Sequence, residues 1–204
     1  MLLNLEQLHK KYNLKINGVI HIGAHHGQEH FTYKNLGINN LIYFEPIEKN
    51  FNVLKNSVDS NCVLYRLALG NDNKKVKMYV ESQNRGMSSS ILEPNIHVTQ
   101  YPHILFNEEE EVDMMKLDDV NFDKTKYNMI NIDVQGYELE VFKGGSNTLE
   151  NIDIIISEIN KEHLYKNGAL VNELIDFLSV YGFRLVEETW AGGNWGDGLF
   201  LKIK

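Results

Sequence analysis

Residues 18–27, with the sequence GVIHIGAHHG, contain the change of pattern that decides the fold. A short apolar strand ends at Ile22, and Gly23 and Gly27 follow where the chain turns into a helix expected over residues 28–36. Glycine lets the backbone approach a ligand closely, and the free N–H groups at a helix start attract a carboxylate or another anion. The segment therefore predicts a ligand-binding turn after the first strand.

Apolar strands and helices keep alternating along the rest of the chain. Further strands are expected at residues 41–45, 62–67, 76–80, 112–117, 128–133 and 152–158, and helices at 2–12, 47–58, 137–142 and 170–181. Strands that are apolar on both faces and alternate with helices imply a parallel sheet covered on both sides. Residues 183–187 and 199–203 are expected to form a closing antiparallel pair. The predicted fold class is α/β, a mostly parallel, doubly wound Rossmann-like sheet with a C-terminal antiparallel hairpin.

The length of 204 residues fits a single domain covering residues 1–204. Residues 1–16 are expected to form an N-terminal helical arm on this domain. Residues 81–111 show no clear period and are too long for an ordinary connector, so we interpret them as a lid or substrate loop. The alternative is a surface excursion in which Glu108–Glu111 form a solvated acidic run.

Composition and charge exclude several classes of function. Acidic side chains outnumber basic ones 28 to 20, a net charge of −8, so nucleic acid is not expected as a partner. Cys62 is the one cysteine, which rules out an internal disulfide and indicates a reducing compartment. The sequence shows no signal-peptide pattern and no apolar run near the ~18–20 residues of a membrane span. A soluble, cytoplasmic protein is expected.

Glu45 ends the second predicted strand, 22 residues after Gly23. An acidic residue at this distance from a glycine-containing first turn is placed to bind both hydroxyls of a ribose. The alternative is an exposed acid at a strand end. The dinucleotide fingerprint would need glycine where His25 and Gln28 stand, so this spacing argues against NAD.

Residues 130–138, with the sequence INIDVQGYE, form a second strand-to-helix turn. The apolar strand delivers Asp133 to the ligand edge of the sheet, and Gly136 permits a tight entry into the helix. Glu138 stands in the first helical turn, where an acid also stabilises the helix dipole, so its role can be structural.

Together these segments resemble the FkbM family of S-adenosylmethionine-dependent methyltransferases. The resemblance is carried by VIHIGAHHGQE, LIYFEP, INIDVQGYELEVFKGG and the late strand IIISEI, and it covers roughly Gly18 to the C-terminus. It implies a class I methyltransferase fold. It also implies methyl transfer to oxygen, commonly a hydroxyl of a sugar, glycan or polyketide.

Carried over residue by residue, the resemblance implies a set of cofactor-binding residues. They are Gly23, Ala24, His25, Gly27, Glu45, Pro46, Ala68, Leu69, Ser89 and Asp133. Glu45 would take the ribose hydroxyls, and Asp133 would lie beside both the methionine amino group and the acceptor. Two positions depart from the family pattern. His21 stands where the family frequently has Asp, and Gln135 stands where it usually has Glu.

Methyl transfer to a hydroxyl calls for a group that draws off the proton. The candidates for this catalytic role are Asp133, Glu158 and His163, with the two carboxylates ranked first. A zinc site built on His26 and His30 is disfavoured because a third nearby ligand is missing. A magnesium site from Asp133 and Glu158 stays open.

Other functions remain open at this stage. A noncatalytic methyltransferase-like binding module and, less favoured, a nucleotide-sugar or NAD enzyme are the alternatives to a methyltransferase. Trp190 and Trp195 could form a stacking platform for a sugar ring or cover the end of the hairpin. The sequence leaves the acceptor and the oligomeric state undetermined.

Overall fold

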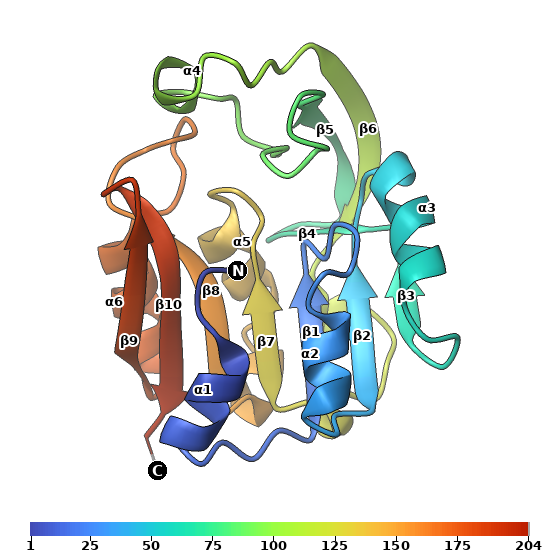
Figure 1. The fold of residues 1–204 in the computed structure, drawn as a ribbon, viewed down its shortest axis with the longest axis vertical. Helices are drawn as coiled ribbons and strands as arrows, with labels where there is room; N and C mark the ends of the chain where they lie inside the picture. The colour runs from blue at the N-terminus through green and yellow to red at the C-terminus, as the bar shows by residue number, and fades with distance from the viewer. Residues whose placement is uncertain (204) are drawn as a thin grey trace.

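The computed structural model describes residues 1–203, which form a seven-stranded sheet with helices on both faces and a separate three-stranded sheet (Figure 1). The order of the larger sheet is β3-β2-β1-β7-β8-β10-β9. Its strands are β1 Gly18–Ile22, β2 Asn40–Phe44, β3 Val63–Tyr65, β7 Met129–Ile132, β8 Ile154–Asn160, β9 Phe183–Ala191 and β10 Trp195–Lys202. The α-helices are α1 Leu5–Lys11, α2 His30–Asn35, α3 Glu48–Ser57, α4 His97–Gln100, α5 Glu138–Gly144 and α6 Val171–Val180. Short 3-10 helices span Leu117–Asp119, Lys124–Lys126 and Thr148–Asn151.

The predicted fold class is confirmed. Strands β3, β2, β1, β7 and β8 run parallel, and β10 pairs antiparallel with both β8 and β9. The first strand has the predicted bounds, Gly18–Ile22, because all five of its residues are buried and Gly23 follows at a φ of +75°. The other elements of the larger sheet lie where expected, with ends shifted by a few residues.

Alternation along each strand divides the apolar side chains between two cores. Ile20 and Ile22 of β1 face α5 and α6, which lie behind the sheet in Figure 1. Val19 packs instead with residues of α1, α2 and α3, on the face where Figure 1 shows α1 and α2 in front. His21 shares this second face, since strand side chains alternate with a period of two. Its imidazole is therefore placed in a core that is otherwise mostly apolar.

The strands predicted near residues 76–80 and 112–117 exist but do not join the large sheet. β5 (Lys74–Val80) and β6 (Glu108–Met115) pair antiparallel, and β4 (Ala68–Leu69) adds to β6 in parallel. The interpretation of Glu108–Glu111 as a loop was wrong, because these residues lie in β6. The antiparallel pairing with β5 places them there, and the exposed ion pairs of Lys75 with Glu111 and of Lys77 with Glu109 lie across the two strands. The sequence does not predict this part of the strand, because four consecutive acids stand where a strand would show alternating apolar residues.

The hairpin strands are longer than predicted, which places both tryptophans in the sheet. Trp190 lies in β9 and Trp195 opens β10. The indole Nε1 of Trp195 donates to the Tyr101 hydroxyl at 2.9 Å. Lys161 Nζ lies 3.8 Å from the ring centroid of Trp190. Across residues 1–203, no helix is both long and apolar enough to cross a membrane.

Candidate functional site

Strand register brings four residues from four strands into one row across the sheet. Gly23 and Asp133 come directly after the last paired residues of β1 and β7. Ile132 pairs with Ser157, so Asp133 lies beside Glu158, which itself pairs with Asp197 of β10. The row lies at the carboxyl ends of the parallel strands, where open α/β sheets bind ligands.

Three cavities surround this row, and we name them by a characteristic residue. The Glu45 cavity is lined by Glu45 together with Ile47, Leu69 and Ser89, among others, and has a volume of about 60 Å³. The Glu29 cavity contains His21 and Asn131 and encloses about 100 Å³. The Trp195 cavity, at about 460 Å³, also contains residues of the segment 97–104. Asp133 and Met87 line all three, so they mark the point where the cavities meet.

Most of the predicted cofactor residues gather around the first two cavities. The Glu45 cavity is lined by Gly23, His25, Glu45, Pro46, Ala68, Leu69, Ser89 and Asp133 of the predicted set. Ala24 lines the Glu29 cavity. Gly27 lines neither of them, and a Cβ placed on it would lie 2.9 Å from Leu54 and 3.0 Å from Val58. Its observed role is close packing of the turn against α3.

Glu45 is held as a buried hydrogen-bond acceptor. One carboxylate oxygen accepts from His25 N and the other from Ile47 N, each at 2.9 Å. Burial raises the pKa of Glu45 to about 7, and these backbone bonds oppose the rise. A carboxylate has about four lone-pair directions, and besides these two backbone donors the Asn50 side chain also hydrogen-bonds to it, so room remains for a further hydroxyl donor. The alternative of an exposed strand-end acid is wrong, since Glu45 is 4% exposed.

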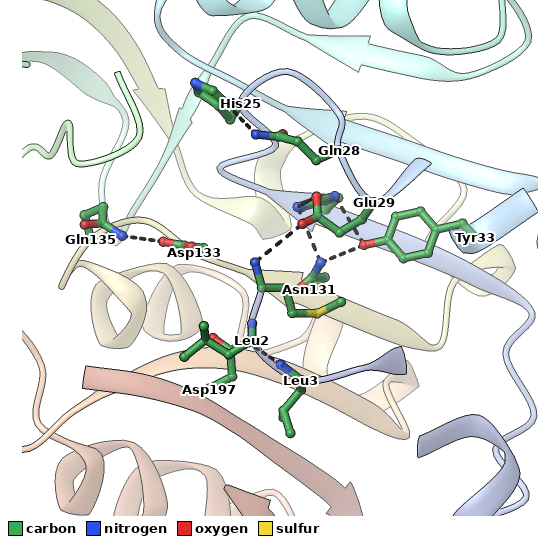
Figure 2. A network of polar contacts seen from close by, with 12 residues as sticks. Leu2, Leu3, His25, Gln28, Glu29, Tyr33, Asn131, Asp133, Gln135 and Asp197 are labelled. Atoms are coloured by element: carbon green, nitrogen blue, oxygen red, sulfur yellow. Dashed lines mark hydrogen bonds and ion pairs between the residues drawn. The ribbon is translucent and has the colours of Figure 1, made fainter. Parts of the chain in front are cut away.

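Gln135 connects the two leading catalytic candidates. Its Nε2 donates to Asp133 at 2.7 Å and to Glu158 at 2.5 Å, and Figure 2 shows the first of these bonds. Its Oε1 lies 2.9 Å from the Tyr165 hydroxyl, which can donate to it. A glutamate at this position could not donate to both carboxylates. The departure from the family pattern therefore replaces a charge with a bridging amide.

Glu138 forms hydrogen bonds that give it a structural role, which the sequence had allowed. One of its oxygens accepts from Val134 N and from Gly136 N, each at 3.1 Å, and so closes the turn after β7. Its second oxygen has no partner among residues 1–203. Burial, followed by repulsion from Asp133, raises the pKa of Glu138 to about 7. Glu138 fixes the turn that presents Asp133.

Glu158 and His163 differ in their relation to the row. Glu158 is 3% exposed, and burial, then Asp133 and Glu138, raise its pKa well above the ordinary value. His163 lies outside the three cavities, and its Nδ1 is 2.8 Å from the carbonyl oxygen of Gly168. The structure therefore brings Asp133 and Glu158 together and leaves His163 apart from them.

The lining of the cavities is rich in carboxylates and carries no lysine or arginine side chain among the described residues. Among the described residues that line the three cavities there is no lysine and no arginine, whereas the carboxylates of Glu29, Glu45, Asp133, Glu158 and Asp197 all contribute. Within the described part of the chain, no group of three or more His, Cys, Asp or Glu side chains could hold a metal ion. The site favours a ligand that is neutral or positively charged.

Met87 limits the space at the junction. The Glu45 and Glu29 cavities are each smaller than the ~300–1,000 Å³ of a typical small-molecule site. Met87 follows Arg85 and Gly86, which have φ values of +61° and +88°. Met87 thus borders the meeting point of the cavities from an exposed turn.

Sequence reasoning missed several lining residues. Glu29 and Asp197 border the cavities without ending a predicted strand, whereas His97 and Tyr101 border them from the segment 81–111 that was interpreted as a lid or substrate loop. In the part of the chain around Asp197, the sequence drew attention only to Trp190 and Trp195. The position of Asp197 opposite Glu158 depends on antiparallel register, which no local pattern in the sequence records.

Sequence comparison finds one family profile over most of the chain. The profile described as "Methyltransferase FkbM domain" matches residues 21–185. The chain is also similar to the 2-O-methyltransferase NoeI of Sinorhizobium fredii, with 26% identity over 148 residues. This match covers 69% of the chain and 60% of NoeI.

Structural comparison finds the same kind of fold in methyltransferases. The magnesium protoporphyrin IX methyltransferase of Synechocystis PCC 6803, solved with bound SAM, matches with a TM-score of 0.55 and 8% identity, covering 98% of this chain and 76% of that one. The ribosomal protein L11 methylase of Lactobacillus delbrueckii subsp. bulgaricus matches with a TM-score of 0.52 and 11% identity, covering 98% and 77%. At such identities the likeness shows a class I methyltransferase fold alone.

Proposed function

The chain belongs to the FkbM methyltransferase family, and from this premise we propose that it transfers a methyl group from S-adenosylmethionine to a hydroxyl oxygen of a sugar or glycan. The observation that carries the proposal is the position of Asp133. This carboxylate borders the two cavities that hold the predicted cofactor residues and the larger Trp195 cavity beyond them. An acceptor in the Trp195 cavity would therefore meet the cofactor at Asp133.

The chemistry of the lining suits S-adenosylmethionine. Ile47, Leu69 and Ile91 offer apolar surface for an adenine ring, and Glu45 offers a charged acceptor for ribose hydroxyls. The absence of lysine and arginine from the described lining suits a cofactor with a cationic sulfur and an ammonium group. A dinucleotide would place its pyrophosphate among carboxylates, which argues against NAD.

The Trp195 cavity suits an uncharged polyhydroxylated acceptor. Trp195 and Tyr101 provide aromatic surface for the apolar face of a sugar ring, and they hold each other through the indole N–H. Asp133, Glu158 and Asp197 provide oxygens that accept from hydroxyl groups. The name of the similar protein NoeI, a 2-O-methyltransferase, supports oxygen as the acceptor atom. Acceptors with phosphate or carboxylate groups are disfavoured by the acidic lining.

Bound S-adenosylmethionine supplies an electrophilic methyl group on a cationic sulfur. Asp133 would accept the proton of the acceptor hydroxyl while the oxygen takes the methyl group, the methyl–sulfur bond breaks and S-adenosylhomocysteine leaves as the neutral thioether. Burial and the neighbouring carboxylates raise the pKa of Glu158 well above its ordinary value, and Asp133 borders all three cavities, so we assign the proton transfer to Asp133. Gln135 holds the two side chains in place. Positioning supplies the rest of the rate enhancement, because the displacement is in line.

The direct test is an activity assay with a panel of acceptors. The protein is incubated with S-adenosylmethionine and neutral, amino or acidic sugars and glycans. Formation of S-adenosylhomocysteine is followed, together with the gain of one methyl group by mass spectrometry. We expect turnover with a neutral or amino sugar and none with its uronic acid counterpart. Micromolar binding of S-adenosylhomocysteine with no methylation of any acceptor would support the noncatalytic module, and binding of NAD instead would overturn the proposal.

Cofactor affinity is expected to depend on pH through Glu45. Its pKa of about 7 in the free protein means that part of the population is protonated near neutrality. Ribose hydroxyls donate more strongly to the ionised carboxylate, so binding releases a proton and affinity rises with pH. Between pH 6 and pH 8 the affinity for S-adenosylhomocysteine should increase by about tenfold, measured by calorimetry.

The control for this titration is Glu45→Gln. It keeps the shape of the side chain and removes the titrating group, so the rise in affinity with pH should disappear and binding should be weak throughout. Glu138 has a pKa in the same range and would keep its titration in this variant. A full pH response in Glu45→Gln would assign the effect to another group.

A further inference from the structure

The Glu29 cavity continues from the Glu45 cavity, with which it shares Gly23 and Asp133. A ligand that sets its ribose on Glu45 would extend its amino-acid part past Gly23 into the Glu29 cavity. That part of S-adenosylmethionine carries an ammonium group, which needs a negative partner when it leaves water. Assigning this partner to a residue of the chain rests on the proposed function.

His21 cannot supply the negative charge. It is 4% exposed, and burial lowers the pKa of its imidazole, so the ring is neutral near pH 7. Its Nδ1 lies 3.2 Å from the Tyr33 hydroxyl, which also accepts from Asn131 Nδ2 at 2.6 Å. Figure 2 shows Tyr33 and Asn131 side by side beneath Glu29. Where the family frequently has aspartate, this chain has a neutral histidine whose contacts are with other buried side chains of the protein.

The side chain of Glu29, at the start of α2, borders the same cavity as His21. One of its oxygens lies 4.0 Å from His21 Nε2, and its side chain is 18% exposed. It holds the N-cap position of α2, yet its side chain forms no capping hydrogen bond. Its carboxylate therefore borders the cavity and caps none of the backbone N–H groups at the start of α2.

A methionine amino group already occupies this position in the structure. The amino group of Met1 lies 3.6 Å from Glu29 and also borders the cavity. Burial alone would lower the pKa of this amino group, but Glu29, Asp133 and Asp197 together raise it. The cavity therefore stabilises an ammonium group even though that group is largely removed from water.

We propose that Glu29 binds the ammonium group of the cofactor's methionine part, in place of the acid that His21 replaces. Asp133, which comes directly after the neighbouring strand β7, borders the same cavity and adds to the negative potential there. The buried contacts of His21 with the Tyr33 hydroxyl at 3.2 Å and with Asn131 Nδ2 at 3.4 Å support the floor of the cavity beneath it. The cofactor would displace the Met1 amino group and take over its ion pair.

The test compares two ligands on the Glu29→Gln variant by calorimetry. S-adenosylhomocysteine carries the amino-acid part, whereas 5′-methylthioadenosine keeps the adenosine and lacks it. We expect Glu29→Gln to weaken S-adenosylhomocysteine by about tenfold, because the charge-assisted hydrogen bond that is lost is only partly offset by loss of the competing Met1 contact at 3.6 Å. Binding of 5′-methylthioadenosine should stay unchanged. Glu6→Gln, an exposed first-turn acid of α1, is the matched control and should alter neither ligand.

Two outcomes would overturn the assignment. Unchanged affinity for S-adenosylhomocysteine in Glu29→Gln would mean that the ammonium binds elsewhere. Equal weakening of both ligands would mean that Glu29 supports the turn rather than the ligand. If the unsubstituted protein bound neither ligand, the failure would belong to the proposed function and not to Glu29.

Discussion

Asp133→Asn is expected to lower kcat for methyl transfer by about 10²–10⁴-fold, the usual contribution of a general base. Asparagine keeps the size of the side chain and can still accept from Gln135, but it cannot take a proton. Affinity for S-adenosylhomocysteine should change by less than about tenfold, because Glu45 and the apolar lining are untouched. Steady-state kinetics together with calorimetry separate the two effects.

The matched control for this substitution is Asp72→Asn. Asp72 is exposed, and its contact with Lys74 lies on the surface at 3.6 Å, so kcat should remain at the level of the unsubstituted protein. Near-normal turnover in Asp133→Asn would remove this residue from the proton transfer. Glu158→Gln would then become the next variant to measure.

Gly23→Ala is expected to abolish cofactor binding and to destabilise the fold. A Cβ on Gly23 would lie 1.9 Å from the carbonyl oxygen of Asp133, and the backbone φ is +75°. Relief of this overlap requires β1 and β7 to move apart at the centre of the sheet. We expect the free energy of unfolding to fall by at least about 3 kcal/mol, measured by urea titration, which places the change in the severe range for single substitutions.

Gly37→Ala isolates the backbone contribution to that loss. Gly37 has the same φ of +75°, but nothing lies within 4 Å of a Cβ placed on it. Its substitution should cost about 1–2 kcal/mol, the penalty of the left-handed conformation alone. The difference between the two variants then measures the overlap with Asp133. Equal losses would show that the sheet absorbs the extra atom without strain.

Much of the fold could be predicted from the sequence because buried parallel strands carry a strong local signal. The first strand and the turn at Gly23 were placed to the residue. The strand of Glu108–Glu111 was missed because it is held by pairing with β5 and by burial of Val112 and Met114 at its far end, whereas the four acids themselves show no apolar alternation. The hairpin was predicted too short because half-exposed residues near Trp190 lack a buried face on both sides.

The candidate site was predictable where function follows from a strand end. Glu45 and Asp133 stand directly after parallel strands, and the carboxyl ends of such strands meet at one edge. Gly27 was assigned to the cofactor by the family resemblance, and the structure shows it packed against α3. The sequence cannot distinguish the two roles, since both need a residue without a side chain.

The sequence by itself determined the fold class, the family and the strand-end acids, because these depend on short motifs and on the periodicity of apolar residues. The tertiary structure alone decided that Asp133 lies beside Glu158, that Gln135 bridges them, and that His163 lies apart. It also decided that Glu29 reaches the cavity over His21. These relations depend on register between strands and on the path of a helix start, which arise from packing across long separations in the chain.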